Sequence, residues 1–357
     1  LFEAFIDPDS VIADPETQRP YECDGLSMYT EMPLLVVLPE TKAQIRQVIK
    51  VCHEHQIPVV ARGAGTGLCA GAMPHKDGVL SSLAKFKNII DIDPLARSAR
   101  LQPGVRNLAI SEAAAHHGLY YAPDPSSQIA CTIGGNVAEN SGGVHCLKYG
   151  LTVHNVLKVE LITMDNEILT FGSEGLDCAG FDLLALLNGS EGLLGIVTEI
   201  TVKLLPLPEK AQVVMAAFDN VQDAGHAVGE VIARGIIPAG LEMMDTHAIN
   251  AAEDFCQAGY PKDAKALLLC EVDGSVDEVQ AHSQEVAAIF QGMGARTRIS
   301  GSEAERALLW KGRKSAFPAV GRISPDYYCM DGTIPRGQLA HVLTAMENLS
   351  AHYQLRV

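Results

Sequence analysis

A glycine-rich cluster near residue 65 has the residue types of a phosphate-binding loop. It runs Arg-Gly-Ala-Gly-Thr-Gly from Arg62 to Gly67, directly after an apolar stretch that predicts a strand. Alternate glycines let the backbone turn tightly and present several N–H groups to a phosphate without interference from a Cβ atom. Gly65–Ala70 also matches a G-x-G-x-x-A dinucleotide fingerprint, which requires a helix to begin at the glycines. A proline and two glycines interrupt the segment that follows, so the Rossmann interpretation is the weaker one.

Two further clusters carry similar chemistry. The second combines Pro-Asp-Pro-Ser-Ser from Pro123, Thr-Ile-Gly-Gly-Asn from Thr132 and Asn-Ser-Gly-Gly from Asn140; the third is Gly-Ser-Glu-Gly from Gly189, followed by Gly-Ile-Val from Gly195. Hydroxyl, amide and bare backbone donors suit a pyrophosphate and the polar edge of an isoalloxazine ring. Glycine turns at strand ends are common, so one cluster is a weak indication. Three clusters together favour a binding site.

In combination these motifs resemble the vanillyl-alcohol-oxidase (PCMH-type) family of FAD-binding proteins. Within it the sequence is similar, over essentially the whole chain, to the FAD-linked D subunits of glycolate oxidases, with D-lactate and D-2-hydroxyglutarate dehydrogenases as relatives. The resemblance implies FAD-dependent oxidation of a small D-2-hydroxy acid, such as glycolate to glyoxylate, by hydride transfer to flavin N5. Three alternatives stay open: a D-lactate dehydrogenase, an NADPH-using enolpyruvyl reductase on the same fold, and a non-catalytic FAD-binding subunit.

The resemblance also implies which residues contact FAD. The first cluster and residues 132–136 would hold the pyrophosphate, residues 126 and 142–143 the flavin side, and residues 191–192 and 196–197 the adenine end. Thr66 stands where covalently flavinylated members carry a His, so we expect non-covalent FAD. The expected contacts are Arg62, Gly63, Ala64, Gly65, Thr66, Gly67, Pro123, Ser126, Thr132, Ile133, Gly134, Gly135, Asn136, Ser141, Gly142, Gly143, Gly150, Glu191, Gly192, Gly195, Ile196 and Val197.

Oxidation of a 2-hydroxy acid also needs a cation that binds the carboxylate, best supplied by a planar bidentate donor. The stretch from Leu309 to Lys314 resembles the family segment that contains the carboxylate-binding Arg, which gives this role to Arg313. The alternative is a solvated helix residue between two lysines. Cys329 occupies the position where 2-hydroxyglutarate dehydrogenases carry a Lys for a second carboxylate, which favours a monocarboxylate substrate.

The catalytic base is the gap in this assignment. Family members carry it, with metal ligands, in a His-x-Gly-Asp-Gly-Asn-x-His motif that does not occur before Val357. None of the twelve His residues has an i, i+4 partner, so we expect no metal site in this chain. His145, just after Gly142–Gly143, is the His that we place near the flavin. The chain therefore has the features of a piece of a longer protein, one that binds FAD and lacks parts needed for full catalysis.

The amino-acid composition limits the classes of partner that we expect for this chain. A net charge of -16 argues against a nucleic-acid surface, which would need clustered cations. Nine Cys residues without a C-x-x-C pair indicate neither a disulfide scaffold nor an iron–sulfur cluster, and favour the cytoplasm. By the resemblance, electrons pass to a companion flavin-type subunit and an iron–sulfur subunit, through which the protein would associate peripherally with the inner membrane. No apolar stretch is long enough to span a bilayer.

The pattern predicts two α+β domains, separated near Pro206. A PCMH-type FAD-binding domain of two α+β subdomains would occupy residues 1–205, with strands at 34–38, 57–61, 88–93, 98–101, 155–164, 167–171 and 195–205 and helices at 41–52 and 105–117. An incomplete ferredoxin-like cap would occupy residues 206–357, with helices on one face of its sheet. Its predicted elements are strands 211–218, 239–244, 265–272 and 295–299, helices 221–234, 246–256 and 276–292, then a helix, a strand at 327–334 and a final helix.

Overall fold

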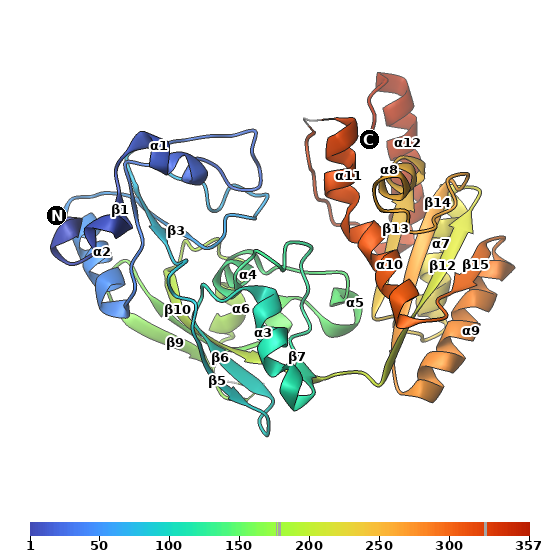
Figure 1. The fold of residues 1–357 in the computed structure, drawn as a ribbon, viewed down its shortest axis with the longest axis horizontal. Helices are drawn as coiled ribbons and strands as arrows, with labels where there is room; N and C mark the ends of the chain where they lie inside the picture. Colours follow the sequence, from blue (N-terminus) through green and yellow to red (C-terminus); the bar gives the residue numbers. More distant parts are fainter. Residues whose placement is uncertain (176, 178–179, 325–326) are drawn as a thin grey trace. The chain divides into compact units, whose positions relative to one another are not determined.

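The computed structural model describes residues 1–175, 177, 180–324 and 327–357. The chain divides into two compact units, Leu1–Leu207 and Pro208–Val357 (Figure 1). Each unit mixes helices with sheets that are mainly antiparallel, which confirms the predicted α+β class.

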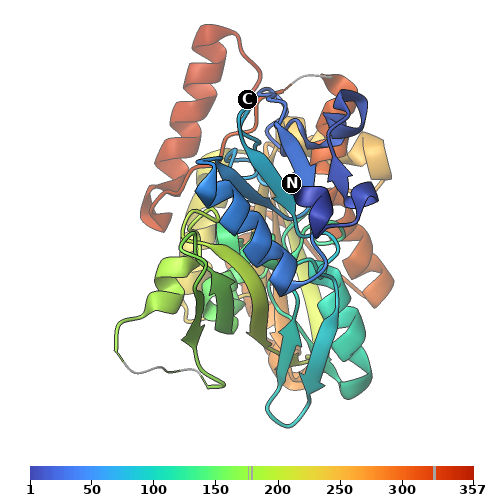
Figure 2. The same cartoon turned by 90° about the vertical axis from the view of Figure 1, so that its left-hand side faces the viewer.

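The first unit contains a small sheet with the strand order β1-β2-β4-β3. Its strands are β1 (Val11–Ile12), β2 (Leu35–Val37), β4 (Val79–Ser82) and β3 (Val59–Arg62). Helix α2 (Lys42–Glu54), in the foreground of Figure 2, begins at Thr41, which forms a capping box with Gln44. One side of α2 buries Val48 against this small sheet, and another side buries Ile45 against the second sheet of the unit. The helix thus joins the two subdomains.

The second sheet of this unit is antiparallel, in the order β5-β6-β10-β8-β9. Its strands are β5 (Ile89–Asp93), β6 (Ser98–Leu101), β10 (Ile196–Lys203), β8 (Val156–Ile162) and β9 (Ile168–Gly172). Helices α3 (Asn107–Ala114) and α4 (Ile133–Glu139) pack their apolar residues on it. The strands predicted at 155–164 and 167–171 form the hairpin β8–β9. Gly118 ends the region predicted as a helix at 105–117, and its φ of 69° is the left-handed conformation common at helix ends.

Shorter elements complete the unit. They are α1 (Pro15–Gln18), α5 (Cys146–Tyr149), α6 (Leu183–Leu187) and the paired strands β7 (Leu119–Tyr120) and β11 (Leu205–Pro206).

The second unit has the predicted ferredoxin-like sheet. Its strands are β12 (Lys210–Phe218), β13 (Gly240–Asp245), β14 (Ala266–Gly274) and β15 (Arg296–Ile299), in the antiparallel order β13-β14-β12-β15. Helices α7 (Val221–Ala233) and α9 (Val276–Gly292) cover one face, where Phe218 and Phe290 lie at the centre of the core. Ser275 caps α9 through a capping box with Glu278, which explains why this helix is readable in the sequence.

The prediction that helices cover only one face of this sheet is wrong. Glu271 of β14 points away from the α7–α9 core, and its carboxylate accepts hydrogen bonds from Arg306 and Trp310 of α10 (Glu303–Lys314). Helix α8 (Thr246–Cys256) packs beside α10 and contacts β13 and β14. Two more helices, α11 (Ala316–Ile323) and α12 (Leu339–Tyr353), follow; α11 packs against α8 and α12 against α7.

The strand predicted at residues 327–334 is also wrong, because these residues form no regular secondary structure. Aromatic and β-branched residues favour strands only where a neighbour supplies the ladder of hydrogen bonds. The two edges of the described sheet, β13 and β15, have no further strand paired with them.

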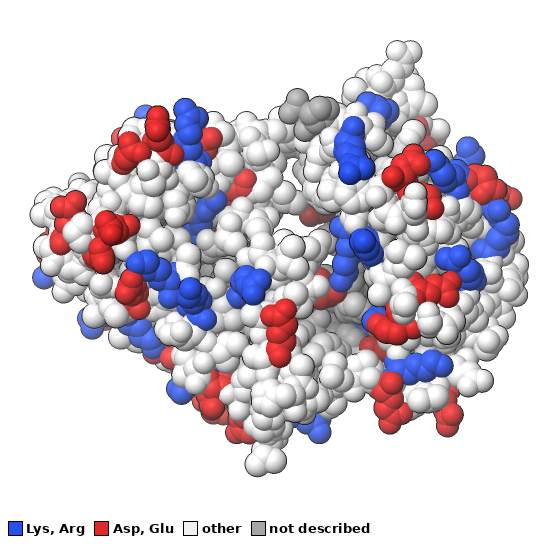
Figure 3. All heavy atoms as spheres, viewed as in Figure 1, with Lys and Arg blue, Asp and Glu red and all other residues white. Residues whose placement is uncertain are grey.

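The distribution of the charged side chains and the state of the described cysteines are both consistent with the sequence. Acidic and basic side chains are interspersed over the face shown in Figure 3. The eight cysteines in the described part of the chain are all free. In the same residues, no helix is both long enough and apolar enough to cross a membrane.

Candidate functional site

The three glycine clusters meet at helix α4. A Cβ atom on Gly63 would overlap the Thr132 hydroxyl at the start of α4, and one on Gly67 would lie 2.7 Å from Glu139 Oε1 at its end. The third cluster joins from the other direction, because the Glu191 N–H donates to Ala138 O over 2.9 Å. Sequence positions far apart therefore form one site.

The first glycine loop is held by close backbone packing. Gly65 has a φ of 66°, a left-handed conformation that favours glycine. The Gly25 N–H donates to Gly67 O over 2.9 Å, which fixes the far end of the loop. No helix begins at these glycines, so the structural condition for a Rossmann fingerprint is not met.

Arg62 anchors the loop through its side chain. The guanidinium is buried, and its Nη1 donates to Cys23 O over 2.8 Å and to Ala72 O over 3.0 Å. Burial lowers its pKa, and the nearby Asp24 carboxylate opposes this effect. The side chain is thus directed at backbone carbonyls and ties residues 20–23 and 72 to the loop.

Asn136 is also committed to the scaffold. Its buried amide donates over 2.8 Å to Asn107, whose own amide donates over 2.9 Å to Pro123 O. This chain connects α4 to the Pro123–Asp124 segment. Gly134 packs so closely that a Cβ atom there would lie 2.5 Å from the Pro103 Cβ, whereas a Cβ on Gly135 would meet only the Thr132 hydroxyl. Of the two glycines, Gly135 is the one with room beside it.

His145 is oriented by Asp124. Its Nδ1 lies 2.9 Å from Asp124 Oδ2, and its backbone N–H donates to Oδ1 over 3.2 Å. Gly143 makes this approach possible, because a Cβ atom at that position would lie 2.5 Å from Asp124 Oδ1. A histidine aligned by a carboxylate is the arrangement that general bases use in many active sites.

Some of the other predicted contacts lie at the surface or beside α4, and others lie in the core. Ser126 is exposed, and Ser141 and Gly142 follow directly on α4, whereas Gly150 has a φ of 80° and packs against His154. The Ile196 side chain instead lies in the core beneath α2, which leaves only its backbone for a contact. Val197 packs against the core on the α3–α4 side of the sheet.

A cluster of two carboxyls and a thiol was not predicted. Ligand atoms of Cys69, Glu139 and Glu191 all lie within 4.8 Å of one another. Burial, followed by the neighbouring carboxylates of Glu191 and Asp24, raises the pKa of Glu139 from 4.5 to about 7. The three residues come from different clusters, so only the folded chain brings them together.

These residues fit FAD. The bare backbone of the first loop suits a pyrophosphate, which cannot approach a Cβ-bearing chain as closely. Within the described residues Glu191 Oε2 is buried without a hydrogen-bond partner, so it can accept from a hydroxyl or amino group of a nucleotide. Two ionised carboxylates at Glu139 and Glu191 would repel a pyrophosphate beside them. Glu139 must therefore hold a proton when a pyrophosphate is near.

Arg313 lies on α10 in the second unit. Its Nε and Nη2 both donate to Glu242 Oε2, over 2.9 and 2.7 Å. Within the described residues, Nη1 makes no hydrogen bond. The guanidinium is partly exposed, at 29 % for the side chain, so the interpretation of a freely solvated helix residue does not describe it. Cys329, at the position of the family's second cation, is partly buried.

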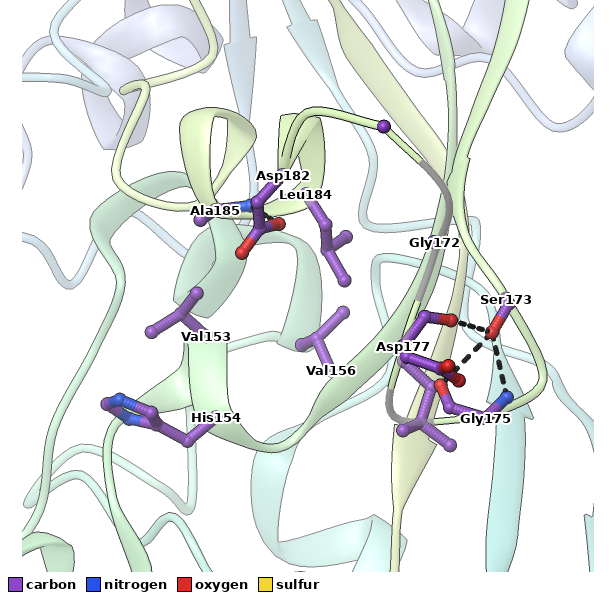
Figure 4. Close-up of a pocket in the computed structure, with 12 residues that line it drawn as sticks. Val153, His154, Val156, Gly172, Ser173, Gly175, Asp177, Asp182, Leu184 and Ala185 are labelled. Atoms are coloured by element: carbon purple, nitrogen blue, oxygen red, sulfur yellow. Dashed lines mark hydrogen bonds between the residues drawn. The ribbon is translucent and has the colours of Figure 1, made fainter.

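A separate cavity of about 310 Å³ opens in the first unit between β8, β9 and α6 (Figure 4). Val153, Val156 and Leu184 line it, and the His154 side chain lies at one side. None of its lining residues in the described chain is a predicted FAD contact. Among the described residues that line it, none belongs to the cluster of carboxyls and thiol at α4.

The fold and the site define a flavin-dependent oxidoreductase, and comparison with known proteins agrees. Residues 33–172 match the FAD binding domain family, and residues 207–357 match the C-terminal domain of FAD linked oxidases. The chain is 63% identical to the glycolate oxidase subunit GlcD of Escherichia coli over 339 residues, covering 95% of this chain and 68% of that protein. It belongs to the family of FAD-linked oxidases that contains the glycolate oxidase D subunits.

Other relatives are more distant. Identity is 38% to the glycolate oxidase subunit GlcD of Bacillus subtilis (94% of this chain, 72% of that protein) and 30% to a D-lactate dehydrogenase of Anaerostipes hadrus (99% and 76%). Two solved structures share the fold at 18% identity. They are alkyldihydroxyacetonephosphate synthase, with a TM-score of 0.79 (98% of this chain, 74% of that chain), and p-cresol methylhydroxylase, with 0.72 (88% and 70%).

Proposed function

We propose that the chain is the flavin-binding catalytic subunit of an enzyme that oxidises a small D-2-hydroxy acid, with glycolate as substrate and glyoxylate as product. The similarity to glycolate oxidase D subunits supports the substrate class. The observation that carries the proposal is the state of Arg313: a guanidinium with one edge bound by Glu242 and Nη1 without a partner in the described chain. That geometry suits a carboxylate.

The reaction removes the hydroxyl proton and the Cα hydride of the substrate. When bound, FAD supplies the hydride acceptor. Arg313 binds and orients the carboxylate, which fixes the position of the Cα–H bond. The glycine loop and α4 hold the pyrophosphate, and Arg62 and Asn136 keep those segments in place through their buried hydrogen bonds. Thr66 offers no imidazole for a covalent flavin link, so we propose a non-covalent cofactor.

His145 is our candidate for the proton acceptor within this chain. Support comes from its pairing with Asp124, which would align the ring and stabilise it once protonated. His145→Gln tests this role: loss of a general base slows substrate-driven flavin reduction by about 10²–10⁴-fold with FAD content unchanged. A rate like that of the wild type would show that His145 is not the base.

The test of the proposed function is anaerobic flavin reduction in the purified full-length protein. Glycolate and D-lactate are added separately, and the visible flavin spectrum is followed. Faster bleaching by glycolate supports the proposal. Faster bleaching by D-lactate would favour the second candidate, a D-lactate dehydrogenase, which the 30% identity to such an enzyme supports.

Two controls bear on the remaining alternatives. Rapid bleaching by NADPH alone would indicate a reductase of another class. Bound FAD that no hydroxy acid reduces would indicate a non-catalytic flavin subunit.

We also propose that electrons leave through partner subunits, a companion flavin-type subunit and an iron–sulfur subunit. The relatives named as glycolate oxidase subunits support an assembly. Co-purification of the tagged full-length protein from its own organism, with iron analysis of the complex, tests this proposal.

A further inference from the structure

We propose that Glu242 is a positioning residue for substrate binding, because it holds Arg313 in the orientation that receives the carboxylate. This inference rests on the proposed function of Arg313. One oxygen, Glu242 Oε2, accepts from both Nε and Nη2 of Arg313. The two donors lie on the side edge of the guanidinium, so the end edge, formed by Nη1 and the second N–H of Nη2, is left for a bidentate ligand.

The sheet register explains why Glu242 is in the right place. Gly240 pairs with Glu271 across β13 and β14, and Glu242 lies two residues further along β13. Residues two apart on a strand share a face, so Glu242 and Glu271 both point to the side where α10 lies. Leu241 and Cys270, between these positions, point into the core on the α7–α9 side.

Helix α10 presents a matching row of donors. Arg306, Trp310 and Arg313 are spaced i, i+4 and i+7 and therefore lie along one stripe of the helix. Glu271 accepts from the Trp310 indole and, over 2.7 Å, from Arg306 Nη1, and Glu242 accepts from Arg313. Glu271 thus holds α10 to the sheet through two side chains, whereas Glu242 binds only the guanidinium at the other end of the stripe.

The helix backbone next to Arg313 is also fixed. A Cβ atom on Gly312 would lie 2.7 Å from the Tyr260 ring, and the Tyr260 hydroxyl donates to Leu309 O. Helix position is therefore set without Glu242. What Glu242 adds is the orientation of the guanidinium itself, which would otherwise turn about the flexible Arg side chain.

The test uses the flavin-loaded full-length protein and oxalate, a carboxylate that the enzyme cannot oxidise by this chemistry. Binding is measured from the perturbation of the flavin spectrum. We expect Glu242→Ala to weaken oxalate binding by about ten- to a hundredfold, the scale of a displaced positioning group. The Kd for glycolate in anaerobic flavin reduction should rise similarly, with a smaller change in the limiting rate. Glu242→Gln keeps an acceptor oxygen and should restore most of the affinity.

Two comparisons separate positioning from a general structural role. Glu303→Gln removes a carboxylate within α10 that pairs with Arg306 three residues further along the helix, and it leaves Arg313 untouched. It should bind oxalate like the wild type. In an Arg313→Met background, adding Glu242→Ala should cause no further loss of affinity, because Glu242 acts through Arg313.

The outcomes distinguish this inference from the proposed function. If Arg313→Met loses oxalate affinity and Glu242→Ala does not, the positioning role is wrong and the proposed function stands. If Arg313→Met binds oxalate like the wild type, the carboxylate role of Arg313 fails, and the inference fails with it. A further loss on adding Glu242→Ala to Arg313→Met would also overturn the positioning role. FAD content and Tm are measured for every variant, so that an unfolded protein is not scored as a binding defect.

Discussion

Gly63 and Thr132 are in such close contact that a single β-carbon at position 63 would overlap the Thr132 hydroxyl. The hydroxyl also accepts from the Gly135 N–H at the start of α4. This contact joins the first glycine cluster to the second. The spacing between the loop and α4 therefore depends on the absence of a side chain at one residue.

Gly63→Ala should separate the loop from α4. We expect a loss of about 1–3 kcal/mol in the free energy of unfolding from overpacking. FAD affinity should fall as well, because the loop donors move. Urea unfolding and equilibrium dialysis with FAD measure the two effects.

Gly229→Ala is the matched control for Gly63→Ala. Gly229 is in the interior of α7, and apart from the backbone of that helix no described atom lies within 4 Å of the position that its Cβ would take. Alanine there should be neutral or stabilising by about 0.5–1 kcal/mol, with FAD binding unchanged. Equal losses in the two variants would show that the packing at Gly63 is not special.

Glu139 should make the stability of the FAD-free protein depend on pH. Its pKa is about 7 in the folded chain, above the ordinary 4.5, because of burial and the nearby Glu191 and Asp24. Between these two values the folded state binds more protons than the unfolded state, so stability falls as pH rises through this window. The Cys69 thiol also faces Glu139 and Glu191, so Cys69→Ser is the control for a contribution of the thiol to the pH dependence.

Glu139→Gln should remove this dependence. The variant should be more stable than the wild type at pH 8 and nearly equal to it at pH 5, as measured by urea unfolding. The same reasoning predicts weaker FAD binding above pH 7, where the ionised carboxylate repels the pyrophosphate. A wild-type profile that is flat from pH 5 to pH 8, or one that Glu139→Gln leaves unchanged, would contradict the assignment.

Much of the fold could be predicted from local signals. Helix α9 was predicted with the bounds it has, because Ser275 and Glu278 form a capping box and its apolar residues repeat at helical spacing. The ferredoxin-like order of the second unit follows from the alternation of strands and helices. These signals lie within a few residues of each other, so they can be read without the tertiary structure.

Helix α4 was not predicted, although the site is built on it. The pair Gly134–Gly135 disfavours a helix by about 1 kcal/mol per residue, so nothing in the sequence indicated a helix at this motif. Burial of Ile133 and Val137 in the core, together with the Thr132 cap, outweighs this cost. The acidic cluster could not be predicted either, because Glu139 and Glu191 meet only after the third cluster folds back onto α4.

The motifs contain residues that face the site and residues that hold the surrounding scaffold. The motifs identified segments that the fold brings together at α4, and within them Arg62, Asn136 and Ile196 turn their side chains into the scaffold. A motif that is required for a site contains both the residues that touch a ligand and those that hold the loop. The sequence does not distinguish the ligand-contacting residues from those that hold the loop, because both kinds lie at fixed spacings from the same glycines.

The Asp124 carboxylate should be needed for local order around His145. Asp124→Asn keeps the size of the side chain. It places an amide where the backbone N–H and the ring Nδ1 of His145 now meet a carboxylate. We expect the free energy of unfolding to fall by about 1–3 kcal/mol, since a buried donor is left without a good acceptor. Thermal unfolding measures this, with Asp165→Asn, an exposed turn residue, as the control. An unchanged Tm would show that the pair contributes nothing to stability.

The buried carboxylate of Glu271 should contribute more to stability than the exposed carboxylate of Glu303, although both bind Arg306. Glu271 is 3 % exposed and binds Arg306 Nη1 over 2.7 Å, whereas the Glu303 side chain is 70 % exposed. Hydrogen bonds with Glu303 and Glu271 raise the pKa of Arg306, so the guanidinium stays charged in either variant. Glu271→Gln keeps the shape but leaves the charge less compensated, which should cost about 1–3 kcal/mol. Glu303→Gln should cost at most about 1 kcal/mol because water screens the pair. Urea unfolding of both variants gives the comparison, and equal losses would mean that burial of Glu271 does not strengthen its hold on α10.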